Sequence, residues 1–376
     1  MRVKLKDIFD LQMGKTPSRS NLEYWNTTDY KWISIADLSK TSKYIFETKE
    51  YLSKSAIKDS GIKAIPASTV VMSFKLSIGK TAITKEDMYS NEAIMAFKDK
   101  HVINILPEYI FYLFKYKNWE EGSNKAVMGK TLNKATLSEI EVEICSIEKQ
   151  RQIVSILNKI MSVVDGRKQE LQLLDALIKA RFVELFGDAI HNDKGWENDT
   201  VEKLCKEIYG GGTPSKSHPE YYEDGDIPWV SSKDMKTDVL TDSQIKINQL
   251  GVDNSTARMV PINSVIMVIR SGILKHTLPV AINAVPITVN QDLKVFIPNE
   301  RVLTRFLAIQ FKMHEKDILS GVRAVTADNI EFNSLKQREL IVPPIELQQE
   351  YVIFLEQIDK SKVAVQKALD ETQILF

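Results

Sequence analysis

The sequence is poor in the residues that hold metals and disulfides, with only two cysteines and five histidines among 376 residues. Cys145 and Cys205 cannot build a disulfide framework or a four-ligand structural zinc site. Three of the histidines, His191, His218 and His276, fall in polar stretches without the spacing of metal ligands. We therefore expect no metal, no cofactor and a reducing compartment, which is the cytoplasm.

Long apolar runs are also missing. Residues 1–15 carry scattered charges and no apolar core of a signal peptide. No run approaches the roughly 20 apolar residues that a membrane span needs. Hydrophobic content of 43% and charged content of 27% are ordinary for a globular protein. These features predict a soluble cytoplasmic protein without a membrane partner.

Motifs of known catalytic centres are absent from the sequence. Gly-Lys-Thr occurs three times, at Gly14–Thr16, Gly79–Thr81 and Gly129–Thr131. A phosphate-binding loop needs another glycine five residues earlier, and none of the three has one. There is no Asn/Asp-Pro-Pro-Tyr/Phe motif of amino-methyltransferases, no Gly-x-Gly-x-x-Gly, no His-Glu-x-x-His and no Gly-x-Ser-x-Gly. We expect a protein that is not an enzyme.

The chain has no excess of charge of either sign, with 50 basic and 50 acidic residues. Its charge is nevertheless uneven: residues 1–145 hold 22 Lys and Arg against 18 Asp and Glu, and residues 188–342 hold 18 against 21. A stand-alone DNA-binding domain is normally strongly basic. If this chain binds DNA, its basic groups must be gathered on one face, or a partner must supply phosphate contacts.

The sequence does contain a duplication with a period of about 198 residues. Gly14–Ser20 aligns with Gly211–Ser217 at an offset of 197, and both copies read Thr-Pro-Ser followed by a basic residue. Further matches keep the same order at offsets of 195–199: Glu23–Trp25 with Glu220–Tyr222, Trp32–Ser34 with Trp229–Ser231, Ile65–Pro66 with Val260–Pro261, Val70–Met72 with Val265–Met267, Asn91 with Asn290, Phe97 with Phe296, and Ile147–Glu148 with Ile345–Glu346. This period far exceeds that of solenoid repeats, so the sequence predicts two tandem homologous domains.

Each half mixes signals for strands and for helices. Thr69–Lys75 and Ser264–Arg270 are short, apolar and β-branched, which is typical of buried strands. Pro107–Lys117 and Arg301–Lys312 are typical of short helices. These elements predict an α+β fold for each half. Trp32 and Trp229 have apolar neighbours, so we expect both in the core rather than stacked on bases.

A heptad pattern follows each half, with apolar residues spaced alternately by four and three. These residues are Ile153, Leu157, Ile160, Val164, Leu171, Leu174, Ile178 and Leu185 in the first segment, and Tyr351, Leu355, Ile358, Val365, Leu369 and Phe376 in the second. The pattern predicts two long helices that pack on each other, the first spanning roughly 57 Å if it is continuous. Gly166 lies in its middle, and we expect a bend there.

These features together resemble the specificity subunits of type I restriction-modification enzymes. The resemblance covers nearly the whole chain and depends on the Gly-Thr-Pro-Ser turn Gly212–Ser215, its counterpart from Lys15, the Trp-Ile/Val-Ser segments, Val289–Gln291, and the glutamine at the entry to each long helix. The sequence departs from the family at Asn91-Glu92, where the second half has Asn-Gln, and at Lys149 and Leu347, where the family usually has Glu.

The resemblance implies two target-recognition domains, at 1–146 and 188–344, separated by antiparallel coiled-coil spacer helices at 147–187 and 345–376. It implies an internal pseudo-two-fold axis between the helices. Each domain would read one part of a bipartite double-stranded DNA target, while the helices set the gap and dock two methyltransferase subunits. Restriction-translocase subunits would join through the complex.

Candidate DNA contacts are the basic and hydroxyl residues of loops, because phosphates attract Lys, Arg, Ser and Thr, and base edges attract Arg, Asn, Gln or Lys. In the first half they are Lys15, Thr16, Ser18, Arg19, Lys75, Lys80, Lys125 and Lys130. In the second half they are Thr213, Ser215, Lys216, Arg270, Lys275, His276 and Arg323.

Two other interpretations stay open at this point. In the first, the chain is the recognition part of a self-contained modification enzyme. In the second, it is a coiled-coil scaffold without a role on DNA. The missing cofactor motifs and the duplication across the whole chain weigh against the first. Loss of sequence-selective methylation on deletion of the gene would reject the second.

Overall fold

The structure is a computed structural model that describes residues 1–75, 77–119, 132–324 and 328–374. Its contacts divide the chain into two compact units. The first comprises Met1–Gly166 and Asp370–Phe376, and the second comprises Arg167–Leu369. Both units mix helices with small sheets, which confirms the predicted α+β class.

The first unit is built on a five-stranded sheet. Its strand order is β2 (Phe9–Met13), β9 (Ile94–Asp99), β6 (Val70–Ser73), β7 (Thr81–Thr84) and β4 (Tyr44–Ile45), antiparallel except for the parallel pair β4 and β7. Smaller sheets join β5 (Glu50–Leu52), β3 (Tyr30–Ile33) and β8 (Tyr89–Ser90), and β1 (Arg2–Lys4) with β10 (Glu141–Glu143). The helices are α1 (Leu5–Ile8), η1 (Leu22–Tyr24), α2 (Ile35–Lys40), α3 (Lys54–Ser60), α4 (Pro107–Tyr116) and α5 (Lys134–Glu139).

The second unit repeats these three sheets in the same strand order and adds one two-stranded sheet, β20 (Arg323–Ala324) with β21 (Asp328–Asn329). Its five-stranded sheet runs β12 (Cys205–Gly210), β19 (Leu293–Pro298), β16 (Val265–Val268), β17 (Val280–Asn283) and β14 (Val239–Leu240). The other smaller sheets join β15 (Lys246–Ile247), β13 (Ile227–Val230) and β18 (Thr288–Val289), and β11 (Asn198–Thr200) with β22 (Glu339–Ile341). Its shorter helices are α7 (Val201–Leu204), η2 (Pro219–Tyr221), α8 (Gln249–Asp253), η3 (Gly272–Lys275), α9 (Thr304–Met313), α10 (Glu315–Ser320) and α11 (Phe332–Lys336). The predicted duplication is therefore a duplication of fold.

The central strands of both sheets are buried on both faces, which explains their uninterrupted apolar sequence. In β6, Val70 and Met72 pack in the cluster that includes α4, and Val71 packs in a separate cluster with Ile33 of β3. All four residues of β6 are buried, as are all four of β16. The predicted strands and the two short helices, α4 and α9, are confirmed.

Two long helices follow the two globular halves, as the heptad pattern predicted. Helix α6 (Ile147–Phe186) is 40 residues long, and α12 (Ile345–Ile374) is 30 residues long. Helix α6 continues through Gly166 as helix, although a glycine there lowers helix stability. The N-terminal part of α6 packs on the first half through Ile153, Val154 and Leu157.

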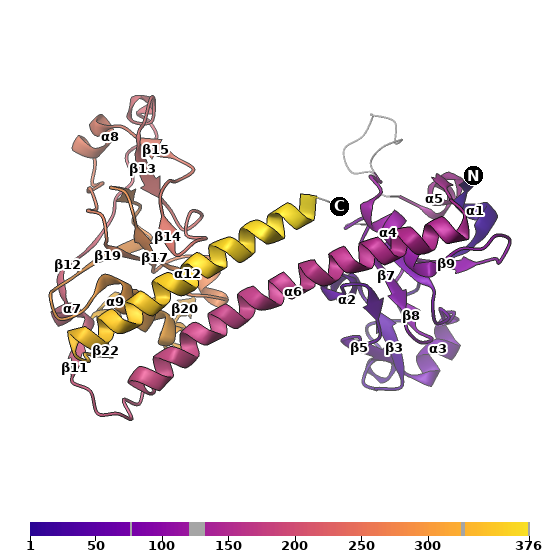
Figure 1. Cartoon of the computed structure of the whole chain (residues 1–376), viewed down its shortest axis with the longest axis horizontal. Coiled ribbons are helices and arrows are strands. Elements are labelled where there is room, and N and C mark those ends of the chain that lie inside the picture. Colours follow the sequence, from indigo (N-terminus) through magenta and orange to yellow (C-terminus); the bar gives the residue numbers. More distant parts are fainter. Residues whose placement is uncertain (76, 120–131, 325–327, 375–376) are drawn as a thin grey trace. The chain divides into compact units, whose positions relative to one another are not determined.

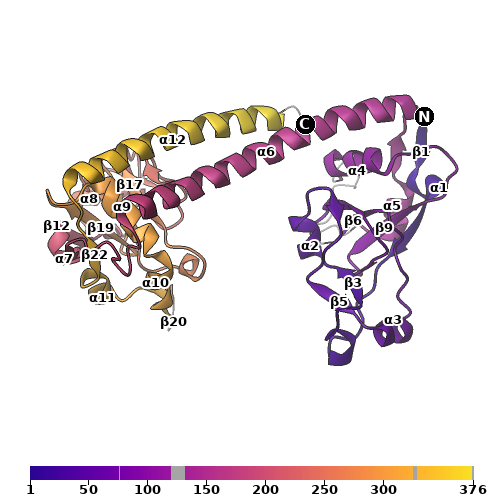
Figure 2. The same ribbon diagram turned by 60° about the horizontal axis from the view of Figure 1, so that its bottom comes forward.

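Within the second unit, α12 runs antiparallel to the C-terminal part of α6, and the two lie side by side (Figures 1 and 2). Arg181 of α6 pairs with Glu350 at 2.7 Å, and Asp175 pairs with Lys362 at 2.5 Å. The residue numbers of the partners thus increase along α12 as they decrease along α6, as they must for antiparallel helices. The Tyr351 hydroxyl, buried among aromatic rings, donates to the Ile178 carbonyl at 2.9 Å.

Candidate nucleic-acid interface

The turn after the first strand of each large sheet is fixed by the scaffold beneath it. In the first half, the backbone N–H of Lys15 donates to the Ser90 carbonyl at 2.8 Å, and the Trp32 indole donates to the Lys15 carbonyl at 3.1 Å. In the second half, the Trp229 indole donates to the Gly212 carbonyl at 2.9 Å. Both tryptophans are buried, as predicted. The shared Thr-Pro-Ser segment is therefore a scaffold turn with an exposed outer side.

The hydroxyl groups of the two turns make matching contacts. Thr16 donates to the Glu92 carboxylate, and Thr213 donates to the Gln291 side-chain oxygen. The side chains of Ser18 and Ser20 hydrogen-bond each other at 2.8 Å, and their counterparts Ser215 and Ser217 do so at 2.7 Å. The threonine hydroxyls fasten each turn to the loop before β9 or β19, and the serine pairs close the turn on itself, so a ligand would have to share these hydroxyls.

The strand directions bring three segments of the first half to one edge of the sheet, namely the edge formed by the strand ends rather than by an outer strand. Strands β2 and β6 end there and β9 begins there, since neighbouring strands are antiparallel. The pKa of Glu92 is lowered chiefly by the hydrogen bond from Thr16, with smaller contributions from the charges of Lys75 and Arg19. Lys80, in the β6–β7 connection, is exposed at the same edge. The structure thus gathers the described candidates of the first half.

Arg19 is the least available of these cations. Its guanidinium pairs with the Glu50 carboxylate through two nitrogens and lies 3.7 Å from the centre of the Trp25 ring. The Lys15 ammonium donates to the Ser60 carbonyl, and none of the described acids forms an ion pair with it. A phosphate would therefore compete with Glu50 at Arg19, whereas Lys15 offers a free charge.

The candidates of the second half gather at the equivalent edge, and two of them are paired with acids. The Arg270 side chain donates to Asp292 at 2.6 Å, and Lys275 lies 3.7 Å from Asp328. Lys216 and His276 are exposed. The predicted cations of this half are therefore more neutralised than those of the first.

Three predicted residues cannot be placed by their side chains. Arg323 begins β20, whose backbone pairs with β21 opposite Asn329, but its side chain is outside the description. Lys125 and Lys130 lie outside the described residues. Whether any of the 15 candidates contacts DNA remains a prediction.

Sequence reasoning missed Lys294 at this edge. Its ammonium lies 4.6 Å from the centre of the Phe332 ring, and a Cβ on Gly210 would come within 2.6 Å of it. Burial lowers the pKa of Lys294. The duplication aligns Lys294 with the buried Met95, and an ammonium at a position that is apolar in the other copy is a signal that the sequence does contain.

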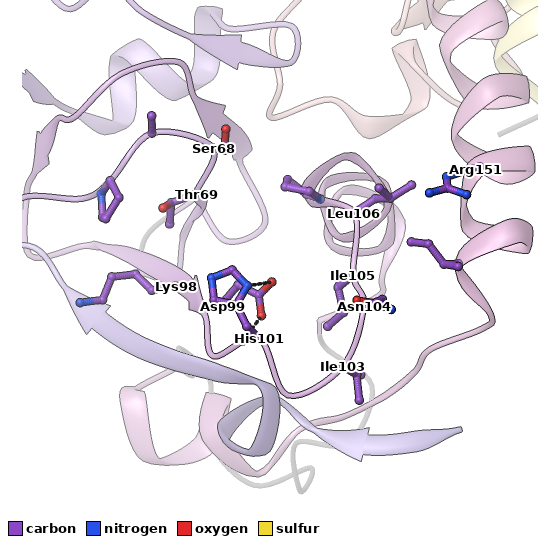
Figure 3. A pocket seen from close by; sticks show the side chains of 14 residues that line it. Ser68, Thr69, Lys98, Asp99, His101, Ile103, Asn104, Ile105, Leu106 and Arg151 are labelled. Carbon is purple, nitrogen blue, oxygen red and sulfur yellow. Dashed lines mark hydrogen bonds and ion pairs between the residues drawn. The ribbon is translucent and has the colours of Figure 1, made fainter.

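A hollow of about 600 Å³ lies at the opposite edge of the first half (Figure 3). Ser68, Thr69, Lys98, His101 and Arg151 are among the residues that line it. The ion pair drawn there joins His101 to Asp99 at 3.3 Å, and the His101 side chain is 86% exposed. No predicted DNA contact lines the hollow.

The part of the chain that the structure describes holds no group of three or more His, Cys, Asp or Glu residues able to bind a metal ion. None of the helices in it is both long enough and apolar enough to cross a bilayer.

Comparison with known proteins agrees with the fold. The family of type I restriction modification DNA specificity domains matches residues 1–175 and 193–372. The chain is 26% identical over 372 residues to the type I restriction enzyme MjaIX specificity subunit of Methanocaldococcus jannaschii, covering 93% of this chain and 84% of that one. It is 33% identical over 219 residues to the EcoR124I/EcoR124II specificity subunit of Escherichia coli, covering 57% and 52%.

Solved structures show the same fold. The S subunit of a type I restriction-modification system from M. genitalium aligns with all of this chain and 93% of its own, with a TM-score of 0.56 at 12% identity. A chain from a study of complex assembly and conformational transition in the type I R-M system aligns over the same shares, with a TM-score of 0.60 at 16% identity. With the family match across both halves, these likenesses show that the chain belongs to the type I restriction-modification DNA specificity family.

Proposed function

We propose that this chain selects the DNA sequence on which a type I restriction-modification complex acts, and that each globular half reads one part of a bipartite double-stranded target. The observation that carries this proposal is a shared scaffold with different exposed edges. The turns Thr16–Ser20 and Thr213–Ser217 are held by matching contacts, whereas the connection beside them is longer in the second half, at residues 269–279, than in the first, at residues 74–80. A common frame with divergent loops suits the reading of two different half-sites.

The long helices supply the distance between the two readings. A rigid helical spacer converts length into a number of base pairs, as half-site spacing does in dimeric DNA-binding proteins. The pairs Arg181–Glu350 and Asp175–Lys362, with the buried Tyr351, hold α12 against α6 in one register. The pseudo-two-fold axis between the helices stays part of the proposal.

The chain acts without a catalytic centre of its own. Methylation and cleavage belong to partners, namely two methyltransferase subunits docked through the helices and restriction-translocase subunits joined through the complex. The near-zero net charge supports such sharing, because a subunit whose partners help to clamp DNA needs less positive charge of its own.

The experiment is purification of the full chain alone and with its methyltransferase subunits. We expect no methyl transfer from S-adenosylmethionine to DNA by the chain alone, and sequence-selective transfer by the complex. Robust methylation by the isolated chain would contradict the proposal. So would a methyltransferase that keeps its selectivity when this chain is withheld.

A further inference from the structure

A second concentration of positive charge lies in the first half, in a groove beside the edge strand β4. We name it the β4 groove and define it by residues 37 and 40–49 together with Lys85. It is a hollow of about 700 Å³. Four lysines line it, at positions 40, 43, 49 and 85, against the two carboxylates of Asp37 and Glu47.

One of these carboxylates is already occupied by backbone groups. Asp37 accepts the backbone N–H and the hydroxyl of Ser34 at 2.9 and 2.6 Å, and its second oxygen accepts the Lys49 backbone N–H at 3.2 Å. Asp37 therefore caps α2 and fixes the loop. Among the described lining residues, Glu47 is the acid that makes no hydrogen bond or ion pair, while Glu108 and Asp165 accept from the groove residues Tyr44 and Ser42 at 2.8 and 3.2 Å.

The lysine side chains make no ion pair with a described residue. Lys40, Lys49 and Lys85 are exposed. The Lys85 ammonium lies 5.4 Å from the centre of the Tyr44 ring and 5.3 Å from that of Phe46, which is 48% exposed. These rings favour the cation without neutralising it. Three charges are thus free to meet an anion without breaking an existing pair.

The second half provides an internal comparison, because the backbone contacts identify the equivalent positions. Lys85 and Ala284 donate their backbone N–H groups to Ile45 and Leu240, the last residues of the two edge strands β4 and β14. Gln244 is likewise equivalent to Lys49. The backbone N–H of Gln244 donates to the Asp234 carboxylate, as the backbone N–H of Lys49 donates to that of Asp37.

A third equivalence adds an acid to the second half. The carbonyls of Lys43 and Asp238 accept the backbone N–H groups of Ile83 and Ile282. Asp238 pairs with Lys312 at 2.5 Å. The segment between Asp234 and Asp238 is two residues shorter than the one between Asp37 and Lys43, but it keeps one exposed lysine, Lys236, beside Thr237 as Lys40 lies beside Thr41. The fold is the same, and three of the four lysine positions of the β4 groove, 43, 49 and 85, carry Asp238, Gln244 and Ala284 in the second half.

We propose that the β4 groove binds the phosphate backbone of duplex DNA, as a contact that the first half makes and the second half lacks at this position. The inference rests on the proposed function. It favours DNA over a protein partner because two identical methyltransferase subunits would require matching surfaces on the two halves. The excess of basic residues in 1–145 over those in 188–342 has its structural counterpart here.

The test compares a triple variant, Lys40→Ala with Lys49→Ala and Lys85→Ala, with wild type, each as the complex with methyltransferase subunits. Binding to a random-sequence duplex is measured as a function of salt. The slope of log Kobs against log salt is negative, and each lost phosphate contact reduces its magnitude by about 0.9, so we expect the triple variant to have a slope that is less steep by about 2–3. A matched control replaces the exposed Lys63, Lys100 and Lys134 by alanine, and its slope should stay at the wild-type value.

The outcomes separate this inference from the function on which it rests. An unchanged slope in a folded triple variant overturns the inference while wild-type DNA binding leaves the function intact. Loss of the methyltransferase subunits from the triple variant, with the slope unchanged, makes the groove a protein-docking surface and also overturns it. A wild-type complex that binds no DNA overturns both. Circular dichroism of each variant verifies folding.

Discussion

Gln150 and Gln348 make the same three hydrogen bonds in the two halves of the chain. Each is fully buried near the start of a long helix. The side-chain oxygen of Gln150 accepts the Leu106 N–H at 2.9 Å, and its amide donates to the Asn104 and Cys145 carbonyls. Gln348 accepts the Leu303 N–H at 3.0 Å and donates to the Arg301 and Pro343 carbonyls. These contacts tie each half to its own helix.

Replacing either glutamine by leucine should destabilise the chain strongly. Three partly buried backbone groups would lose their partner, and a group left unsatisfied in a buried site costs about 1–3 kcal/mol. We expect Gln150→Leu and Gln348→Leu each to lower the free energy of unfolding by about 3 kcal/mol, measured by urea titration. The exposed neighbours supply the controls, Gln152→Leu and Gln349→Leu, which should change it little. A loss confined to one of the two buried positions would contradict their equivalence.

The indole N–H of Trp229 should matter to DNA binding although the ring is buried. Trp229→Phe keeps an aromatic ring in the core but removes the hydrogen bond to the Gly212 carbonyl. We expect a loss of about 1 kcal/mol of stability and weaker target binding by the complex, because the turn Gly212–Ser217 is less fixed. Thermal melting and DNA titration measure the two effects. If the variant melts at the expected lower temperature but binds DNA as tightly as wild type, the turn does not need the indole hydrogen bond for DNA binding.

Acid should weaken the second half through His314. The ring is only 3% exposed, and burial followed by the nearby Arg338 charge lowers its pKa below the ordinary 6.5. The unfolded chain therefore binds more protons at this position as the pH falls below about 6.5, so stability contributed above that pH is lost on acidification. The carboxylates of Asp188 and Asp317 act in the opposite direction but do not reverse the shift.

The corresponding variant is His314→Phe, which has no titrating ring. Urea unfolding between pH 5 and 8 should show a shallower dependence on pH than in wild type. Comparison of the two proteins cancels the titration of groups that they share. Parallel stability curves for wild type and variant across this range would rule out the assigned role of His314.

Much of the architecture follows from the sequence because duplication makes weak signals repeat. The Thr-Pro-Ser turns and the tryptophans each appear twice at an offset of 197 and the glutamines at the helix entries at 198, and each pair has the same contacts in the structure. The heptad pattern predicts the two long helices because only one face of each can be buried. The uninterrupted α6 at Gly166 shows that one glycine does not end a helix that tertiary contacts support.

The interface is less predictable because exposure and pairing depend on three-dimensional neighbours. Arg19 and Arg270 are sound candidates by residue type, yet each is paired with an acid from a distant segment, Glu50 and Asp292. Lys294 and the lysines beside β4 lie outside the shared motifs, so a search built on those motifs passes over them. Their meaning comes from comparing equivalent positions of the two halves after the strands are aligned.

The most direct test of two independent readers is exchange of one half. Residues 188–344 would be replaced by the corresponding domain of a specificity subunit with a different target, and methylated bases would be mapped genome-wide. The account predicts a new bipartite motif in which one part and the gap length are kept and the other part is that of the donor. A motif that is unchanged, or altered in both parts at once, would contradict it.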